Sequence, residues 1–439
     1  MTFFVLSPAG KPVFISRGGL SEEEESMYTG LMATARALLA FADSRFHGLR
    51  VFKSSSGRHL HFLDCPPLTF LAVADATTPG PVTRARLALL HAQVAGLLTQ
   101  PALCAVYERQ PGYDARRLLV GSGDRMLRAM IDGFATRPCS FLGAVPVRVM
   151  GCGRRRAVTD GLRRALCASG SAFGVLFDSE GRLVSSSASS VAGAALCAWD
   201  LILLGNLCRV LEQAETVLSV CLPFYDGRGN FFAYARQHGG YTVILLTGAE
   251  IADVEVFREA SMAVLGLCCG CPDGEAACER NGALRADGHP EVHILFKNSR
   301  VNQYVMSGPC PPSAGGLGEV LGRYARMRVG MFAVDGADVP MAEQMLASLE
   351  ASRSSRRSRL HRGRGQIRPF HGFRLECVGA TTYVAFANAD AELYVSMDSS
   401  VVAGRDGQTH AGAVEFATAL RARLVRQTQR LFYFPEPND

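Results

Sequence analysis

Residues 3–15 read Phe-Phe-Val-Leu-Ser-Pro-Ala-Gly-Lys-Pro-Val-Phe-Ile, and this stretch decides the fold. Two runs rich in aromatic and β-branched residues flank a short polar segment that contains proline, glycine and lysine. Such runs are typical of strands, and the polar segment between them is typical of a tight turn. The stretch therefore predicts a β-hairpin within the first fifteen residues.

The same design occurs twice more along the chain. Residues 173–184 read Phe-Gly-Val-Leu-Phe-Asp-Ser-Glu-Gly-Arg-Leu-Val, and residues 292–301 read Val-His-Ile-Leu-Phe-Lys-Asn-Ser-Arg-Val. The three starts lie about one small domain apart. We therefore expect the hairpin to open each of three repeated units.

A helix is predicted to follow the first hairpin. Ser21 is followed three residues later by Glu24, which is the spacing of a capping box at a helix start. The helical pattern continues to Phe41, and its apolar positions near one face are Met27, Leu31, Ala35, Leu38 and Leu39. Strands are then predicted at 49–53, 59–63 and 68–74, and a second helix at 82–98.

The two later units repeat this order. In the second we expect a helix at 191–213, strands at 217–222, 231–236 and 242–246, and a helix at 254–267. In the third we expect a helix at 317–327, strands at 374–378, 383–387 and 392–395, and a helix at 412–431. Helices at 125–135 and 155–168 join the first two units. The sequence thus predicts an α/β (α+β) chain of three domains, 1–140, 141–280 and 281–439, each a mainly antiparallel sheet flanked by helices.

Charge is concentrated in one segment of the chain. Lys and Arg number 46 against 40 Asp and Glu, a formal net charge of +6. Seven arginines and no carboxylate lie between Arg353 and Arg368, so the rest of the chain is close to neutral. A protein that coats nucleic acid spreads positive charge over a face, so we expect no nucleic-acid partner. Residues 350–366 have a low-complexity composition that predicts a mobile insertion in the third unit.

Motifs for covalent chemistry or cofactor binding are missing from the sequence. The pair Gly10-Lys11 is followed by Pro12, which excludes a phosphate-binding loop, and neither a nucleophile elbow nor a zinc-binding His-Glu-x-x-His helix occurs. No apolar run reaches the roughly 20 residues that span a bilayer, and the N-terminus lacks the pattern of a signal peptide. We therefore expect a protein without a cofactor, a catalytic residue or a membrane span.

Most of the 14 cysteines stand alone in apolar segments, where they are predicted to behave as small hydrophobic residues. This interpretation covers Cys104, Cys167, Cys197, Cys208, Cys221 and Cys377. Cys268, Cys269, Cys271 and Cys278 form the exception, but their spacing does not give two clean zinc-ligand pairs. A zinc- or thiol-dependent enzyme built on this cluster stays open as an alternative, although no metal is expected.

The ordered set of motifs resembles a known family. The opening hairpin is similar to the start of a longin domain, in particular that of the Mon-one family, the larger subunit of the Mon–Ccz complex. Further similar stretches are Ser-Phe-Leu-Gly-Ala-Val at 140–145, Cys-Leu-Pro-Phe-Tyr-Asp at 221–226 with Gly-Asn-Phe-Phe-Ala-Tyr at 229–234, residues 293–303, and Ala-Glu-Leu-Tyr-Val at 391–395. The resemblance covers almost the whole chain apart from residues 329–368.

The resemblance implies three longin domains and a Ccz-type longin partner. It also implies nucleotide exchange on a Rab-seven-type GTPase in endosome-to-vacuole trafficking, at a surface shared by the first longin domains of both subunits. The matching candidates here are Lys11, Arg17, Tyr28 and Met32, each of which could equally be an ordinary turn or packing residue. The chain is then expected to be cytoplasmic and bound peripherally to late endosome or vacuole membranes.

Two features depart from the family's pattern. The family usually carries a long polar segment before the first strand, whereas the strand here begins at Phe3, so regulation through such a segment is not expected. The arginine-rich insertion is the second departure, and it is a candidate for contact with an anionic or phosphoinositide-containing membrane through Arg356, Arg357, Arg359, Arg362 and Arg364. The alternatives for this segment are a nuclear-localisation-like or RNA-binding tract, or an inert disordered insert. The alternative for the whole chain is a vesicle-coat or tethering subunit of longin type.

Overall fold

The computed structural model describes residues 1–18, 21–46, 49–110, 112–269, 292–307, 310–332, 341–353, 371–402 and 409–434. The chain divides into two compact units. The first unit comprises Met1–Phe134, Cys221–Gly229 and Val339–Arg357. The second comprises Ala135–Val220, Asn230–Asp338 and Ser358–Asp439. We describe each unit by itself.

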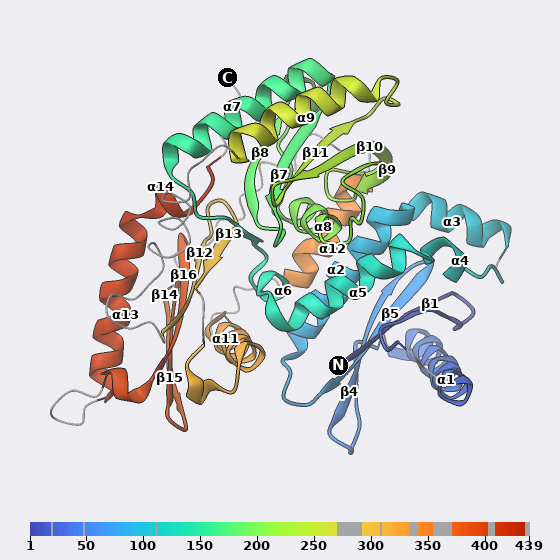
Figure 1. Ribbon diagram of the computed structural model, residues 1–439. Helices are drawn as coiled ribbons and strands as arrows, with labels where there is room; N and C mark the ends of the chain where they lie inside the picture. Colours follow the sequence, from blue (N-terminus) through green and yellow to red (C-terminus); the bar gives the residue numbers. More distant parts are fainter. Residues whose placement is uncertain are drawn as a thin grey trace. The chain divides into compact units, whose positions relative to one another are not determined.

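The first unit is built on a five-stranded antiparallel sheet (Figure 1). Its strands run in the order β2-β1-β5-β4-β3, with bounds β1 Thr2–Leu6, β2 Pro12–Ile15, β3 Val51–Lys53, β4 Arg58–Cys65 and β5 Leu68–Asp75. Helices of the unit are α1 Glu22–Phe46, α2 Gly80–Leu98, α3 Gln100–Arg109, α4 Arg116–Leu119, α5 Ser122–Thr136 and α12 Met341–Arg353. The predicted first hairpin is confirmed, since β1 and β2 pair antiparallel.

Alternation along β1 explains why helices cover both faces of this sheet. Phe4 and Leu6 are fully buried against α1 in a cluster with Met32 and Leu39. Phe3 points to the other face, where its ring lies 5.5 Å from that of Phe134 on α5. Successive side chains of a strand point to opposite faces, so a continuous apolar strand needs cover on both sides.

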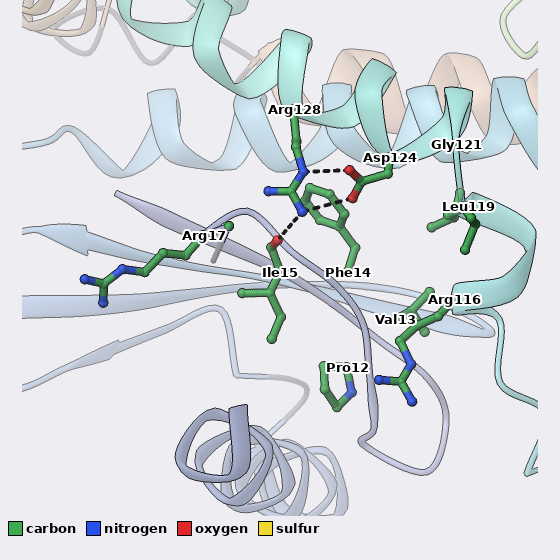
Figure 2. Close-up of a pocket in the computed structure, with 12 residues that line it drawn as sticks. Pro12, Val13, Phe14, Ile15, Arg17, Arg116, Leu119, Gly121, Asp124 and Arg128 are labelled. Atoms are coloured by element: carbon green, nitrogen blue, oxygen red, sulfur yellow. Dashed lines mark hydrogen bonds and ion pairs between the residues drawn. The ribbon is translucent and has the colours of Figure 1, made fainter. Parts of the chain in front are cut away.

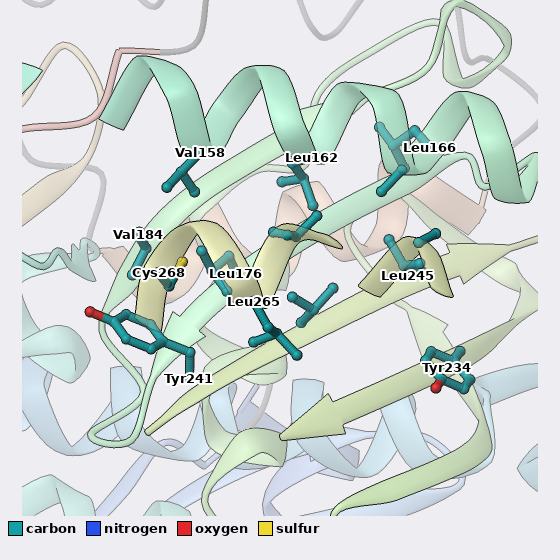
Figure 3. Close-up of a cluster of buried hydrophobic side chains, with 14 of the residues drawn as sticks. Val158, Leu162, Leu166, Leu176, Val184, Tyr234, Tyr241, Leu245, Leu265 and Cys268 are labelled. Carbon is teal, nitrogen blue, oxygen red and sulfur yellow. The ribbon is translucent and has the colours of Figure 1, made fainter. Parts of the chain in front are cut away.

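The second unit contains two sheets, and the first of them has the order β8-β7-β11-β10-β9. Its strands are β7 Phe173–Asp178, β8 Leu183–Ala188, β9 Glu215–Leu222, β10 Asp226–His238 and β11 Tyr241–Thr247. The last residues of β9 and the first residues of β10, within Cys221–Gly229, are counted with the first unit. Helices α7 (Cys152–Ser169) and α9 (Val254–Cys269) pack side by side over a core that includes Leu162, Leu176 and Leu265 (Figure 3). Gly161 permits this approach, because a Cβ there would lie 2.5 Å from Leu267 Cδ1.

The other sheet of the second unit has six strands in the order β14-β15-β16-β12-β13-β6. They are β6 Val145–Pro146, β12 His293–Asn298, β13 Gln303–Met306, β14 His371–Val378, β15 Thr381–Asn388 and β16 Ala391–Asp398. The remaining helices of the unit are α6 Cys139–Leu142, α8 Ala198–Cys208, α11 Leu317–Phe332, α13 Thr409–Arg426 and α14 Thr428–Leu431, with short 3-10 turns at Ser190–Ala192, Pro312–Ala314 and Ser399–Val402.

A short connecting segment joins the two sheets of the second unit. The backbone N–H groups of Val145 and Val147 donate to the backbone carbonyls of Asn302 and Tyr304 at 2.8 and 3.0 Å. Tyr304 lies on β13 of the six-stranded sheet, and Asn302 directly precedes this strand. The backbone N–H of the next residue, Arg148, donates to the Leu183 carbonyl of the five-stranded sheet at 2.9 Å. The segment therefore supplies hydrogen bonds to both sheets within four residues.

All three sheets place the opening hairpin in the same position. In each, the two hairpin strands are neighbours, and the first of them pairs with the last strand of the following three-stranded meander. The second hairpin strand is the edge strand in both five-stranded sheets, whereas β6 pairs outside it in the six-stranded sheet. Both later hairpins, β7–β8 and β12–β13, are antiparallel as predicted. The α/β (α+β) fold class with three mainly antiparallel sheets is confirmed, whereas the domain limits at residues 140 and 280 stay a prediction.

Three predicted elements differ from the structure. The helix expected at 191–213 is confined to α8, because Gly193 adopts φ +71° and Cys197, which precedes α8, is extended. The final helix is broken at Gln427 into α13 and α14. Residues 350–353, predicted to belong to a mobile insertion, form the last turn of α12 because Leu349 and Met345 are buried. The arginine-rich residues 354–368 lie outside the described residues.

No single helix among those the structure describes is both long enough and apolar enough to cross a bilayer. Helices α2 and α3 meet that requirement only as a pair, and they are bent by 77° at their junction.

Candidate functional site

The candidate surface residues of the first unit lie around the β1–β2 hairpin and α1. Lys11 is exposed in the hairpin turn, and its backbone N–H donates to the Ser7 hydroxyl at 3.1 Å. The turn also needs Gly10, whose φ is +76° and whose N–H donates to the Ser7 carbonyl at 2.9 Å. The turn backbone is therefore held in place while the ammonium group of Lys11 faces solvent.

Arg17 and Tyr28 lie next to each other on this surface. Arg17 Nη1 donates to the Tyr28 hydroxyl at 3.1 Å and lies 4.0 Å from the Glu24 carboxylate. The hydrogen bond to Tyr28, followed by the charges of Tyr28 and Glu24, raises the pKa of Arg17. The structure thus brings together two of the four predicted residues as one cationic-aromatic pair.

The start of α1 is fixed by the capping box that the sequence predicts. Ser21 N–H donates to Glu24 Oε2 at 3.1 Å, and Glu24 N–H donates to Ser21 Oγ at 3.2 Å. These two bonds satisfy donors that a helix start otherwise leaves without partners. Because Glu24 also lies beside Arg17, the cap holds the Arg17–Tyr28 pair against the first turn of α1.

Met32 does not belong to this surface. Its side chain is fully buried and packs with Phe4, Leu6 and Leu71 beneath α1. An apolar side chain at this position stabilises α1 on the sheet, so it offers no area to a partner in this conformation. The predicted contact surface is therefore narrowed to Lys11, Arg17 and Tyr28.

The apolar face predicted for α1 is only partly the buried one. The sheet buries Met32, Ala35 and Leu39, whereas a second apolar stripe beside them stays exposed. The stripe is made of Met27, Leu31, Leu38 and Phe41, with exposed fractions of 59%, 43%, 41% and 56%. At 100° per residue these four positions span about 80° of the helix circumference. The sequence pattern could not separate the buried face of α1 from the exposed face beside it, because both faces are apolar.

The stripe has the properties of a docking surface. Exposed leucine, methionine and phenylalanine residues aligned along one helix are unusual on a surface that contacts only water. Helix-in-groove and helix–helix recognition both use anchors at such spacings. We call these four residues the α1 stripe.

A groove of about 500 Å³ lies between β2 and the α4–α5 segment (Figure 2). β2 is an edge strand, and residues 12–15 line the groove together with Arg17, Leu119 and Val120. Arg128 closes one end, where it pairs with Asp124 at 2.6 and 3.0 Å and donates to the Ile15 and Ser16 carbonyls. The Arg128 guanidinium thus covers part of the strand edge that would otherwise attract another chain.

Helix α12 is a second feature that the sequence analysis missed. It belongs to the first unit, where Arg84 of α2 pairs with Glu343 at 2.8 Å and Arg50 with the same carboxylate at 3.7 Å. Together with β4 and α2 it lines a cavity of about 350 Å³. The sequence does contain the pattern that predicts this helix, because the apolar residues Ala342, Met345 and Leu349 repeat at helical spacing. All three are buried in the structure.

The described residues hold no group of three or more His, Cys, Asp or Glu side chains that could bind a metal ion. Within the cysteine-rich stretch, Cys268 belongs to α9 and is buried in the core of the second unit, while Cys271 and Cys278 lie outside the described residues. The described surface of the first unit therefore presents features suited to contact with another molecule: the Arg17–Tyr28 pair, the α1 stripe and the groove beside β2.

Comparison with known proteins identifies the class of this chain. Residues 1–128 match the family model described as the first longin domain of FUZ, MON1 and HPS1. These residues include the first sheet, α1 and the groove, so the surface described above is the surface of a longin domain.

Curated relatives then narrow the class to one family. The chain is 30% identical over 321 residues to vacuolar fusion protein MON1 homolog B of Macaca fascicularis, covering 67% of this chain and 56% of the relative. It is 31% identical over 321 residues to the Mus musculus homolog B (67% and 55%), and 27% identical to MON1 of Yarrowia lipolytica over 321 residues (69% and 56%). The chain therefore belongs to the MON1 family, and its matched part spans about half the length of these relatives.

Proposed function

We propose that this protein acts in vacuolar fusion and trafficking as one subunit of a heteromeric guanine-nucleotide exchange factor. Its GTPase is of the Rab-seven type, its partner is a Ccz-type longin subunit, and it works on the cytoplasmic side of late endosome and vacuole membranes. The observation that carries the proposal is the similarity over 321 residues to relatives named vacuolar fusion protein MON1.

The proposed activity needs no covalent chemistry. An exchange factor binds the nucleotide-free GTPase more tightly than the nucleotide-bound form, and by linkage it lowers the affinity for nucleotide by the same factor. The work is done by contacts that displace the elements holding Mg²⁺ and phosphate. A surface with cationic, aromatic and apolar groups, but without a metal-binding cluster among the described residues, suits this role.

We assign different roles to the two parts of the first-unit surface. The α1 stripe is apolar and extends along about four turns of the helix, so we assign it to the permanent longin partner. Lys11, Arg17 and Tyr28 are polar and exposed or half-buried, so we assign them to the transient contact with the GTPase. Arginine and tyrosine are the side chains most enriched at interface hot spots.

A nucleotide-release assay tests the proposal. The purified chain, alone and with a Ccz-type subunit, is mixed with a Rab-seven-type GTPase loaded with fluorescent GDP and excess unlabelled GTP. We expect the pair of subunits to accelerate release at least tenfold over the intrinsic rate. Stable assembly of the pair without acceleration would favour a vesicle-coat or tethering subunit instead.

The same assay tests the assigned GTPase contact. Replacing Arg17 with Glu in the assembled pair should lower the exchange rate by about 5- to 30-fold, because an interface arginine typically contributes about 1–2 kcal/mol. The matched control is Arg300→Glu in the second unit. Arg300 is also exposed and also pairs with one carboxylate, that of Asp390 at 2.9 Å. Equal effects of the two variants would remove Arg17 from the contact.

We further propose that the arginine-rich segment binds anionic or phosphoinositide-containing membranes. Each arginine near an anionic surface contributes about 1 kcal/mol, so five of them act together. Replacing Arg356, Arg357, Arg359, Arg362 and Arg364 with Ser should weaken sedimentation with phosphatidylserine vesicles, most clearly at low salt, and leave exchange in solution unchanged. Unchanged sedimentation would return the segment to the class of inert inserts.

A further inference from the structure

Cys377 differs from the small hydrophobic residue that the sequence predicted, because the structure exposes it. It lies near the end of the edge strand β14, and its Sγ is 3.4 Å from Nε2 of His410. His410 is also exposed, and it is the second residue of α13. A thiol and an imidazole from two separate elements therefore meet within hydrogen-bond distance at the surface.

A third side chain, on the neighbouring strand β15, also contacts the Cys377 sulfur. Thr382 lies directly opposite Cys377 on β15, and its hydroxyl is 3.7 Å from Sγ. This hydroxyl is nearly fully buried and bonds the Ser399 hydroxyl at 2.9 Å. The sulfur thus has two polar neighbours, a hydroxyl on the adjacent strand and an imidazole on α13.

The other cysteines provide a comparison within the same molecule. Burial raises the pKa of the Cys208 thiol, and burial followed by the charge of Asp200 raises that of Cys197. Both thiols are therefore kept protonated and shielded from reagents. Cys152 and Cys167 are exposed like Cys377, but Cys152 donates its S–H to the Gln429 carbonyl at 3.5 Å and has no imidazole as its bonded partner there.

We propose that Cys377 is a redox-modification site that forms a mixed disulfide with a low-molecular-weight disulfide such as oxidised glutathione, with His410 Nε2 as the proton acceptor. The Cys377 proton moves to Nε2, and the thiolate attacks one sulfur of the disulfide. The S–S bond of the reagent breaks, and the departing thiolate takes the proton back from His410. The Cys377 sulfur is oxidised and the released sulfur is reduced, so the electrons balance.

The expected size of the effect follows from the thiolate population. A free cysteine is only a few per cent thiolate at neutral pH, so complete transfer of its proton raises that population by at most about thirtyfold. A stabilised thiolate is intrinsically less nucleophilic, which reduces the gain to about tenfold. The inference is independent of the proposed exchange function, since it needs neither the partner nor the GTPase.

Site-resolved modification of the full chain tests this inference. The protein is incubated with oxidised glutathione at pH 7, quenched with iodoacetamide, and digested for mass spectrometry, so that Cys377, Cys152 and Cys167 are read in the same sample. We expect Cys377 to react about tenfold faster than Cys167.

Two variants separate proton transfer from other effects. His410→Ala should bring the Cys377 rate down to that of Cys167, and His410→Gln, which keeps a hydrogen-bonding side chain without a base, should do the same. Unchanged rates at Cys152 and Cys167 in both variants show that the fold is intact. A Cys377 rate equal to that of Cys167 in the original protein, or one that either variant leaves unchanged, would overturn the proposal.

Discussion

Replacing Glu392 with Gln is expected to lower the free energy of unfolding of the second unit by about 3–5 kcal/mol. The Glu392 side chain, on β16, is 3% exposed. Its carboxylate accepts hydrogen bonds from Lys297 Nζ at 2.8 Å, Arg328 Nε at 2.9 Å and the Tyr394 hydroxyl at 2.7 Å. The three donors come from β12, α11 and β16, so one carboxylate ties a helix to two adjacent strands.

The size of the effect follows from what the substitution leaves behind. Lys297 and Arg328 have side chains only 7% and 14% exposed, so the substitution takes a hydrogen-bonded carboxylate away from two cations that are largely shielded from water. Burial alone would raise the pKa of Glu392, but the charges of Arg328 and then Lys297 outweigh it and hold that pKa well below its usual range. The contribution of Glu392 is therefore fully present above pH 4.5 and is lost as the pH falls below that value.

The single tryptophan provides the measurement. Trp199 lies on α8 of the second unit, so its fluorescence during urea titration at pH 7 reports the unfolding of that unit. Asp390→Asn is the matched control, because Asp390 is two residues away and pairs with Arg300 at an exposed site, where such pairs contribute at most about 1 kcal/mol. A loss below 1 kcal/mol for Glu392→Gln would show that water reaches this cluster.

The parts of the fold that the sequence predicted are those with local signals. A hairpin needs two β-rich runs and a turn, and all of these lie within about twelve residues, so Phe3–Ile15 could be interpreted without knowledge of the rest. The capping box at Ser21 and Glu24 is equally local, and its two hydrogen bonds form as predicted. The common strand order of the three sheets follows because each hairpin is succeeded by a helix and a three-stranded meander.

The features that the sequence did not reveal depend on contacts between distant segments. The apolar pattern of α1 cannot distinguish Met32, which the sheet buries, from Leu31, which it leaves exposed. Helix α12 was not predicted, because the residues that follow it are highly charged and of low complexity, which favours an insertion without regular structure. Cys377 meets His410 only because α13 begins beside the end of β14, across 33 residues of chain.

The α1 stripe carries the other prediction with a large expected effect, and it rests on the proposed function. The double substitution Leu31→Asp and Leu38→Asp should reduce the affinity for a Ccz-type partner by at least about 100-fold. Fully burying one leucine contributes about 1.5–3 kcal/mol, and each aspartate adds the cost of desolvating a charge. Two such positions in one interface therefore exceed the roughly 2.8 kcal/mol that a 100-fold change requires.

The variant should leave the isolated chain folded, because both leucines already contact solvent, with exposed fractions of 43% and 41%. Binding is measured by titrating labelled partner onto the immobilised chain, and folding by the thermal melting temperature of the same preparation. Val425→Asp on α13 is the control, since Val425 is 49% exposed and also lies on a helix. Loss of affinity in both variants would mean that added negative charge, rather than the stripe, disfavours the partner. Loss confined to the α1 variant, with an unchanged melting temperature, would assign the apolar face that the first sheet leaves uncovered to the permanent subunit contact.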